Sequence, residues 1–241
     1  MDNAGVLLHL QHEDQNFNPG DYLTLLSPYE TPFVLHKAGR LRSWTFTQTD
    51  ACQYIDIRPS GMTNPVVAIR GQGVPFYTQA MGGEGNAWVR IFTFKNRWFD
   101  FQYYLFDKKP KPTGNCGLQV INPETGAVVV DSSWQFMIPG SNYLQSYSVK
   151  PPSDSLPVES IGVSLKSYGK GFSLGGNDAF VGLSEAKSSY NGILYGCGTE
   201  QSGDDVLIKW VPLTPMSAKI TTGSVYSQFY AVKTETLDND M

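Results

Sequence analysis

The sequence predicts an all-β fold built as two β-sandwich-like domains in tandem, and three observations lead to this prediction. The chain of 241 residues carries 24 glycines and 15 prolines spread along its length, so few windows are long enough for a helix. Aromatic residues make up 13% of the chain, and such side chains favour strands. The longest window without glycine or proline, 86–109, alternates between apolar and polar positions as a strand does.

The first half of the chain contains short strand candidates that are separated by glycine, proline and polar turns. The expected strands are 5–10, 22–26, 33–36, 41–47, 54–57, 66–69, 88–94 and 98–106. The last two should form a hairpin around Lys95 and Asn96. In 41–47, alternation places Trp44 and Phe46 on one face of the expected strand. We therefore expect residues 1–107 to form an N-terminal β domain.

Residues 108–116 are expected to be a linker, because prolines and clustered lysines favour a solvated, extended chain. A hairpin is predicted directly after it, over 117–133. Asn122 and Pro123 open its turn, since proline presets φ at the second turn position, and Gly126 can take the left-handed conformation that closes a short loop. A linker between two hairpins predicts a domain boundary, with a C-terminal β domain over 117–241.

The second half repeats the pattern of short strands. Beyond the hairpin, the expected strands are 135–138, 144–149, 161–165, 180–181, 193–195, 206–211, 218–221 and 225–234. Each half ends in an aromatic strand, 99–106 in the first and 225–230 in the second. Two related sandwiches would give this similarity, and so would chance, so the sequence leaves both explanations open.

Charge and cysteine content argue against several classes of function. The net charge is −4, and apart from 108–111 no segment is rich in lysine or arginine, which argues against a nucleic-acid binder. Cys52, Cys116 and Cys197 are far apart and form no CxxC pair, so we expect buried thiols. The first ten residues lack a basic n-region, and no segment approaches the ~20 apolar residues of a membrane-spanning helix. We therefore expect a soluble product without a signal peptide or membrane insertion.

One motif has the form of a catalytic element. Residues 171–175 match GxSxG with Ser173 at its centre, as in a nucleophile elbow. The histidine of that fold follows the serine, whereas His9, His12 and His36 all precede Ser173 here. The sequence therefore favours a glycine-rich β-turn. His9 and His12 also lack the i, i+4 spacing of a HExxH zinc site, so we expect no metal ligands there.

Paired carboxylates are the remaining catalytic possibility. Asp100 with Asp107, or Asp204 with Asp205, would suit a glycosidase if the two carboxyl groups faced each other across a cleft. Both pairs lie in expected surface strands or turns, so the sequence favours ordinary surface roles. We expect no catalytic, cofactor-binding or metal-binding residue.

The aromatic strand 98–106 is apolar on both faces, which indicates that each face is buried against another layer of the protein or against another chain. Only 17% of the residues are charged, whereas an isolated domain normally keeps its outer faces more charged. We therefore expect an assembly interface on this strand or on 225–230, and the alternative is a second face packed inside a thick core. The candidate interface residues are Trp98, Phe99, Phe101, Tyr103, Tyr104, Phe106, Tyr226, Phe229 and Tyr230.

The segment around the linker resembles a known family. The residues that carry the resemblance are Tyr103, Phe106, Asp107, Pro112, Gly117, Leu118, Gln119, Val120, Asn122, Gly126, Val130, Asp131 and Ser132. This pattern, a strand, a proline-bearing linker and a GLQVxN…G…VxDS hairpin, resembles minor tail or tail-tip virion proteins of tailed bacteriophages. It covers some thirty of the 241 residues, and the pattern carries no chemistry, so no functional residue is transferred with it.

The resemblance implies a structural component of a phage tail, at the tip or baseplate, that is made in the host cytoplasm and acts by assembly. Its partners would be other tail proteins and further copies of itself, with a host receptor or glycan as an additional partner, and it would need no cofactor and bind no nucleic acid. The alternatives are a receptor- or glycan-binding module, which would expose aromatic side chains at loop tips, and a hydrolase, which would show a cleft with paired carboxylates.

Overall fold

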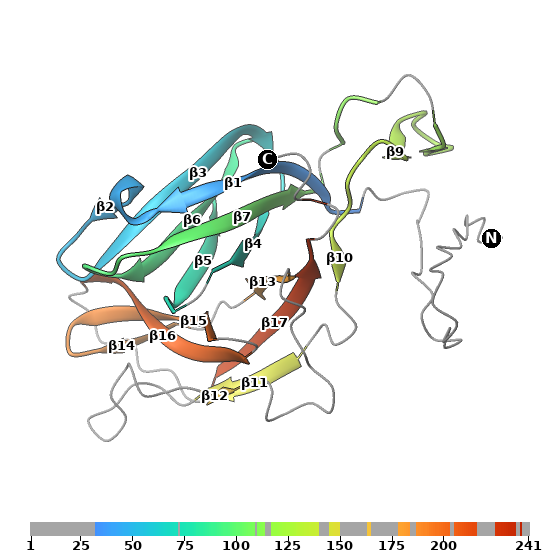
Figure 1. The fold of residues 1–241 in the computed structure, drawn as a ribbon. Helices are drawn as coiled ribbons and strands as arrows, with labels where there is room; N and C mark the ends of the chain where they lie inside the picture. Colours follow the sequence, from blue (N-terminus) through green and yellow to red (C-terminus); the bar gives the residue numbers. More distant parts are fainter. Residues whose placement is uncertain are drawn as a thin grey trace, which may run out of the picture.

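The structure is a computed structural model, and it describes residues 32–71, 73–108, 110–113, 117–139, 145–149, 163–164, 178–183, 187–202, 205–215, 225–234 and 237 (Figure 1). Within these residues the secondary structure is β-strand, apart from the single 3₁₀ turn η1 (Ser43–Thr45). All strand pairs are antiparallel. The predicted all-β class is therefore confirmed.

The strands form two large sheets and one small one. The first sheet has the order β1 (Val34–Arg42), β7 (Asp100–Asp107), β4 (Val66–Arg70), β13 (Asp178–Leu183), β17 (Val225–Lys233) and β10 (Ile138–Pro139), with β11 (Gln145–Val149) also paired to β17. The second sheet has the order β12 (Val163–Ser164), β16 (Asp205–Pro215), β15 (Ile193–Ser202), β5 (Phe76–Met81), β6 (Ala87–Phe94), β3 (Cys52–Met62) and β2 (Thr47–Gln48), with β14 (Lys187–Tyr190) paired to β15. The third sheet is the hairpin of β8 (Gln119–Ile121) and β9 (Val128–Asp131).

The two large sheets pack against each other through a common apolar core. Alternation along each strand directs every second side chain into this core. The first sheet contributes Leu41, Val67, Ile69, Phe101, Tyr103 and Leu105, and the second contributes Ile57, Met62, Phe76, Ala87, Val89 and Ile91. The molecule is therefore a β-sandwich.

The expected division into two tandem sandwiches is not what the sheets show. Phe180 of β13 pairs with Ile69 of β4 in the first sheet, and Thr199 of β15 pairs with Phe76 of β5 in the second. Strands from beyond 108–116 thus extend both sheets that begin before it. The prolines of this segment do favour an extended chain, but β4 and β5 would be open sheet edges without the later strands, and open edges favour pairing.

The outer faces of the central strands are also covered. On the first sheet, Tyr104 and Phe106 are fully buried in a second cluster with Leu35, Val232 and Leu237. On the second sheet, the β15–β16 hairpin curls over the outer face, where Val211 and Leu213 pack with Tyr77 and Phe92. The Cys52 thiol donates a hydrogen bond to the Leu213 carbonyl at 2.6 Å. The thick core that the sequence left as an alternative is therefore the one present.

The predicted hairpin after the linker is confirmed. Asn122 Oδ1 accepts the backbone N–H groups of Glu124 and Thr125 at 2.9 and 3.1 Å, and Gly126 takes a φ of +70°. The hairpin stands apart from the two large sheets (Figure 1). Leu118 and Ile121 are exposed on it.

Some predicted strand positions need correction. The expected strand 41–47 is interrupted by η1, so Trp44 and Phe46 do not share a face: Trp44 is exposed and Phe46 is buried. Strands β5 and β14 were not predicted. The expected strands 5–10, 22–26 and 218–221 lie outside the described residues.

Candidate functional site

The candidate interface residues on β7 and the residue before it are core residues. Phe99, Phe101, Tyr103, Tyr104 and Phe106 are all buried within the single chain, at 5% exposure or less. Their prediction as an assembly surface is wrong, because the second layer that covers the strand comes from the same chain. Tyr226, Phe229 and Tyr230 lie on β17, and their side chains are outside the described part of the structure.

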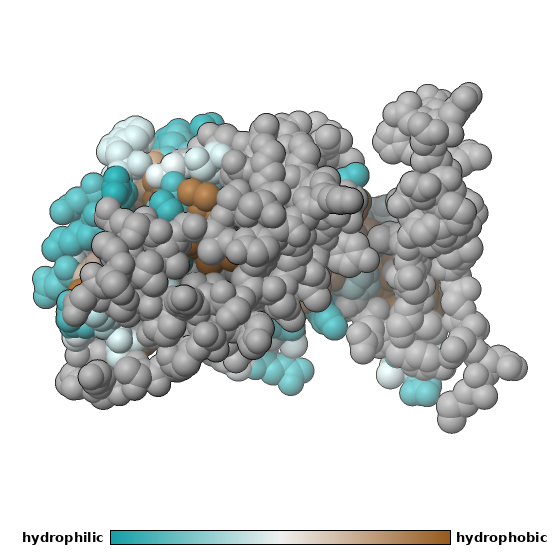
Figure 2. Space-filling model, turned by 90° about the horizontal axis from the view of Figure 1, so that it is seen from below, coloured by the Kyte–Doolittle hydropathy of each residue, from teal (hydrophilic) through white to brown (hydrophobic). Residues whose placement is uncertain are grey.

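Trp98 is the exception in this group, because 75% of it is exposed. It lies beside Trp44, which is 62% exposed, with the ring centroids 5.8 Å apart and the planes at 53°. In the view of Figure 2 the described surface is largely hydrophilic, with smaller hydrophobic areas between. The two adjacent indoles are both more than half exposed, and we define the tryptophan platform as Arg40, Arg42, Trp44, Trp98 and Asp100.

Trp44 is presented by η1, which is held on both sides. The Thr45 hydroxyl donates to the Arg42 carbonyl at 2.7 Å, and the Ser43 N–H donates to the Phe99 carbonyl at 3.1 Å. One residue beyond the turn, the Phe46 ring meets the Phe99 ring edge-on at a centroid distance of 4.7 Å. Burial of Phe46 and Phe99 anchors the chain in the core directly after η1, so η1 directs Trp44 outward.

Trp98 lies in the tight connection between β6 and β7, which is fixed by a buried amide. Gln53 is fully buried, and its Nε2 donates to the carbonyls of Phe94 at 2.9 Å and Arg97 at 3.1 Å. Gln48 donates in turn to Gln53 Oε1 at 2.6 Å. Asn96 takes a φ of +59° in this connection, which leads from β6 in the second sheet to β7 in the first. The predicted hairpin of these two strands is therefore wrong, because they pair with other strands in different sheets. Because the buried Gln53 side chain is hydrogen-bonded to this loop, the backbone that carries Trp98 is fixed in position.

The rim of the platform is charged. Asp100 accepts from Arg40 Nε at 2.6 Å and from Arg42 Nε at 3.4 Å, and the Arg42 guanidinium lies 5.2 Å from the centre of the Trp44 ring. The hydrogen bond from Arg40, together with the charges of both arginines, lowers the pKa of Asp100. The platform thus combines two aromatic faces with ionised donors and an ionised acceptor.

The predicted carboxylate pair Asp100 and Asp107 does not form a glycosidase site. The two residues are the first and last of β7, so seven residues of extended chain place them roughly 23 Å apart. Glycosidase carboxyl groups lie about 5–9.5 Å apart. Asp107 is buried and accepts the backbone N–H groups of Thr63, Asn64 and Lys108 at 2.7–2.8 Å, which is a structural role.

The other predicted or excluded sites are only partly within the described structure. Ser173, His9 and His12 lie outside it, as do Cys116, Asp204 and the side chain of Asp205. Cys52 and Cys197 are buried free thiols, as predicted. In the part of the chain that can be described, no cluster of three or more His, Cys, Asp or Glu side chains is placed to hold a metal ion.

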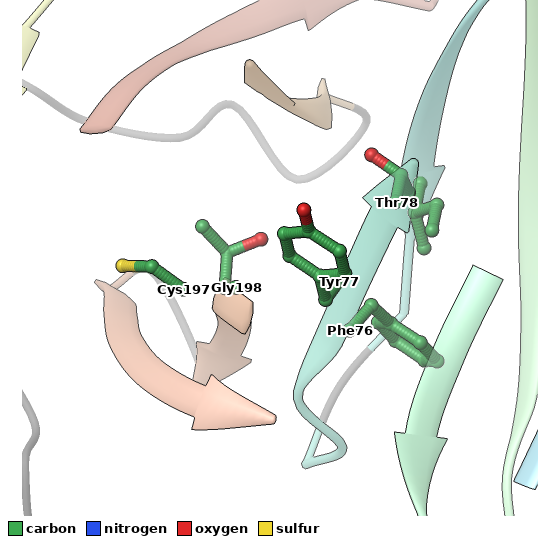
Figure 3. Close-up of a pocket in the computed structure, with 7 residues that line it drawn as sticks. Phe76, Tyr77, Thr78, Cys197 and Gly198 are labelled. Carbon is green, nitrogen blue, oxygen red and sulfur yellow. The ribbon is translucent and has the colours of Figure 1, made fainter. Parts of the chain in front are cut away.

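Cavities lined by described residues include the following two. One lies between β5 and β15, where the Tyr77 ring faces Cys197 and Gly198 (Figure 3), and its volume of about 10 Å³ suffices for a single water molecule at most. The other, of about 200 Å³, is lined by Gly73, Pro75, Phe94, Arg97, Glu200 and Lys209. Its Lys209 is paired with Glu200 at 2.5 Å. Neither cavity has the arrangement of a catalytic centre.

Comparison of the chain with protein-family models, with curated proteins and with solved structures finds no match. Among the described residues, no helix is long and apolar enough to span a membrane. The tryptophan platform is therefore identified from its geometry. The sequence indicated Trp98 but not Trp44 beside it, because the alternation of 41–47 continues through Trp44 and gives no local signal.

Proposed function

We propose that this chain is a non-catalytic structural subunit of a bacteriophage tail, and that the tryptophan platform is its outward contact surface. The observation that carries the proposal is the exposure of Trp44 and Trp98 on a rigid base. Large exposed aromatic side chains are costly to hold in water and are enriched at binding surfaces. All five buried candidates on and next to β7 serve the core instead, and among the described side chains Trp44 and Trp98 are the large exposed aromatic ones.

The chemistry of the platform favours binding over catalysis. Its two arginines are paired with Asp100, whose lowered pKa keeps it ionised near neutral pH. An indole offers no acid or base for proton transfer at neutral pH, and a carboxylate held by two guanidinium groups is a weak general base. The tail context rests on the resemblance of the hairpin around β8 and β9 to phage tail proteins.

The test is to determine whether the protein is part of a virion. Particles released from the phage or prophage that carries the gene would be purified, and mass spectrometry would measure the protein in the isolated tail fraction. We expect the chain in stoichiometric amounts. Its absence from purified particles, with abundant protein in the lysate, would overturn the proposal. Particles carrying Trp44→Ala and Trp98→Ala together should then show either loss of the subunit or loss of adsorption.

A further inference from the structure

We propose that the tryptophan platform binds carbohydrate, so that the subunit contributes to recognition of a glycan. This inference rests on the proposed function and names the ligand class of the same surface. The relevant ligand is a chain of pyranose units, whose rings each have one face rich in C–H groups and a periphery of hydroxyl groups. The platform matches both parts of such a ligand.

The aromatic part of the match is the pair of indoles. The face of an indole carries partial negative charge, which attracts the polarised C–H groups of a sugar ring. Trp44 and Trp98 are separated by 5.8 Å between ring centroids and tilted by 53°. This separation is comparable to the length of one pyranose unit, so two successive sugars of a bent chain can each contact one ring. The exposed fractions of 62% and 75% leave both indoles accessible.

The polar part of the match is the rim. A guanidinium carries five N–H donors, and the contacts of Arg40 and Arg42 with Asp100 involve only their Nε groups. Asp100 remains partly exposed and can accept from hydroxyl groups. Because the ion pairs fix these groups beside the indoles, donors and acceptors lie ready for a ligand that offers both. Sugar hydroxyl groups do so.

The area of the platform argues against a protein as the sole occupant. Two indoles that are each more than half exposed present roughly 300 Å², given the 150–250 Å² that a large aromatic side chain can bury. A standard protein interface needs about 800 Å² on each partner. An oligosaccharide of a few units needs much less, so the platform alone is sufficient for it.

Charge argues against single-stranded nucleic acid, which would also stack on indoles. Asp100 lies between Arg40 and Arg42 and neutralises one of their two positive charges. Phosphate groups need unneutralised cations for affinity, and the chain as a whole has a net charge of −4. A neutral or weakly charged glycan therefore fits the platform better than a polyphosphate.

The experiment is a binding titration with the purified full chain. The probes are oligosaccharides of four to six units of glucose, mannose or N-acetylglucosamine, together with a dodecamer of thymidylate, each followed by isothermal calorimetry up to about 10 mM. We expect at least one oligosaccharide to bind with a Kd of about 0.1–1 mM, typical of a small exposed contact surface. Trp98→Ala should weaken that binding at least ~10-fold, and Trp98→Phe should restore most of it because a ring is retained.

The control is Ile121→Ser, which removes an exposed apolar side chain from the remote β8–β9 hairpin. Its affinity should equal that of the unaltered chain. The inference is overturned if no oligosaccharide binds, if binding is unchanged in both Trp44→Ala and Trp98→Ala, or if only the thymidylate oligomer binds at the platform. If no oligosaccharide binds but the chain with both Trp44→Ala and Trp98→Ala is no longer incorporated into particles, the carbohydrate-binding inference is wrong and the proposed tail function stands. If sugars bind at the platform but the chain is absent from virions, the proposed tail function is wrong and the carbohydrate-binding inference stands.

Discussion

At the scale of single residues, buried and partly buried polar side chains fix the loops around the sandwich. Gln53 holds the β6–β7 connection below Trp98, and Asp107 collects three backbone N–H groups at the other end of β7. Asp56 joins neighbouring strands, accepting two hydrogen bonds from Arg90 at 2.6 and 2.9 Å and one from Arg58 at 2.7 Å. These contacts stabilise the fold and the loops from which the two exposed indoles project.

Asp107→Asn should destabilise the protein by about 2–3 kcal/mol. An amide keeps the shape of the carboxylate but replaces one acceptor oxygen by an NH₂ group, which must face a backbone N–H in a buried site. Urea unfolding followed by circular dichroism would measure the change. Asp50→Asn, at an exposed position, is the control and should change stability by less than about 0.5 kcal/mol. Equal stability of the two variants would refute the structural role of Asp107.

Asp56 predicts a specific dependence of stability on pH. Burial alone would raise its pKa, but the hydrogen bonds and charges of Arg90 and Arg58 outweigh burial and lower the pKa below 3.8. A lowered pKa in the folded state stabilises the protein above the unfolded value, and this stabilisation is lost as pH falls through the folded value. Asp56→Asn should therefore cost about 1 kcal/mol at pH 7 and progressively less below about pH 4.

The measurement for Asp56 is urea unfolding of both proteins between pH 7 and pH 2.5. The difference in unfolding free energy between them should shrink as the pH falls. Glu124→Gln, on the exposed turn between β8 and β9, is the control. A difference that stays constant over the range, or grows on acidification, would contradict the assignment of the lowered pKa.

At the scale of elements, the β15–β16 hairpin can cover the second sheet only because two of its residues lack a side chain. A Cβ built on Gly196 would lie 2.6 Å from the Tyr77 ring. A Cβ on Gly198 would lie 2.6 Å from the carbonyl carbon of Phe76, and closer still to its oxygen. Such a contact with backbone atoms cannot be relieved by a change of rotamer. The two glycines therefore let β15 approach β5 closely enough to pair at Thr199.

Gly198→Ala should destabilise the protein by about 3 kcal/mol, because the methyl group forces β15 away from β5. The matched control is Gly83→Ala, where nothing lies within 4 Å of the added Cβ and φ is not positive. That substitution should be neutral or slightly stabilising, because alanine reduces the entropy of the unfolded chain. Thermal unfolding followed by circular dichroism would separate the two. A neutral Gly198→Ala would show that the close approach is not required.

The elements that the sequence predicted well are those in which alternation is local and regular. The positions of β4, β6, β7 and β17 match the expected strands closely, because each has a run of apolar and aromatic residues between turn signals. The strand 41–47 failed because its alternation continues through η1, and the turn there depends on the Ser43 N–H meeting the Phe99 carbonyl far along the chain.

The domain arrangement and the burial of the β7 aromatic residues could not be predicted for a similar physical reason. A strand apolar on both faces requires two covers, and the sequence of that strand does not say whether the second cover is another chain or a later part of the same one. Here Leu237 and Val232 cover β7, and Leu213 covers β3. The Trp44–Trp98 pair was likewise not predictable, since the two tryptophans are 54 positions apart in the sequence and meet only when η1 docks beside the β6–β7 connection.

At the scale of the whole molecule, the second half of the chain extends both sheets and covers the outer faces of strands from the first half, so the sandwich should unfold as a unit. Each half alone would leave open edges at β4 and β5 and an exposed apolar face around Tyr77 and Phe92. We predict a single transition in urea, with coincident curves from far-ultraviolet circular dichroism and tryptophan fluorescence. Two separated transitions would instead indicate the tandem domains that the linker suggested.

The central claim is that the tryptophan platform is the surface through which this protein meets its partner, and the indole N–H signals of its five tryptophans test it most directly. Trp44 and Trp98 are exposed, whereas Trp134 and Trp210 are buried at 4% and 0% exposure and serve as internal references. In two-dimensional ¹H–¹⁵N spectra recorded with envelope fragments of the host of the proposed phage, we expect the Trp44 and Trp98 signals to shift or broaden while those of Trp134 and Trp210 remain. Binding that leaves the Trp44 and Trp98 signals unchanged would contradict it.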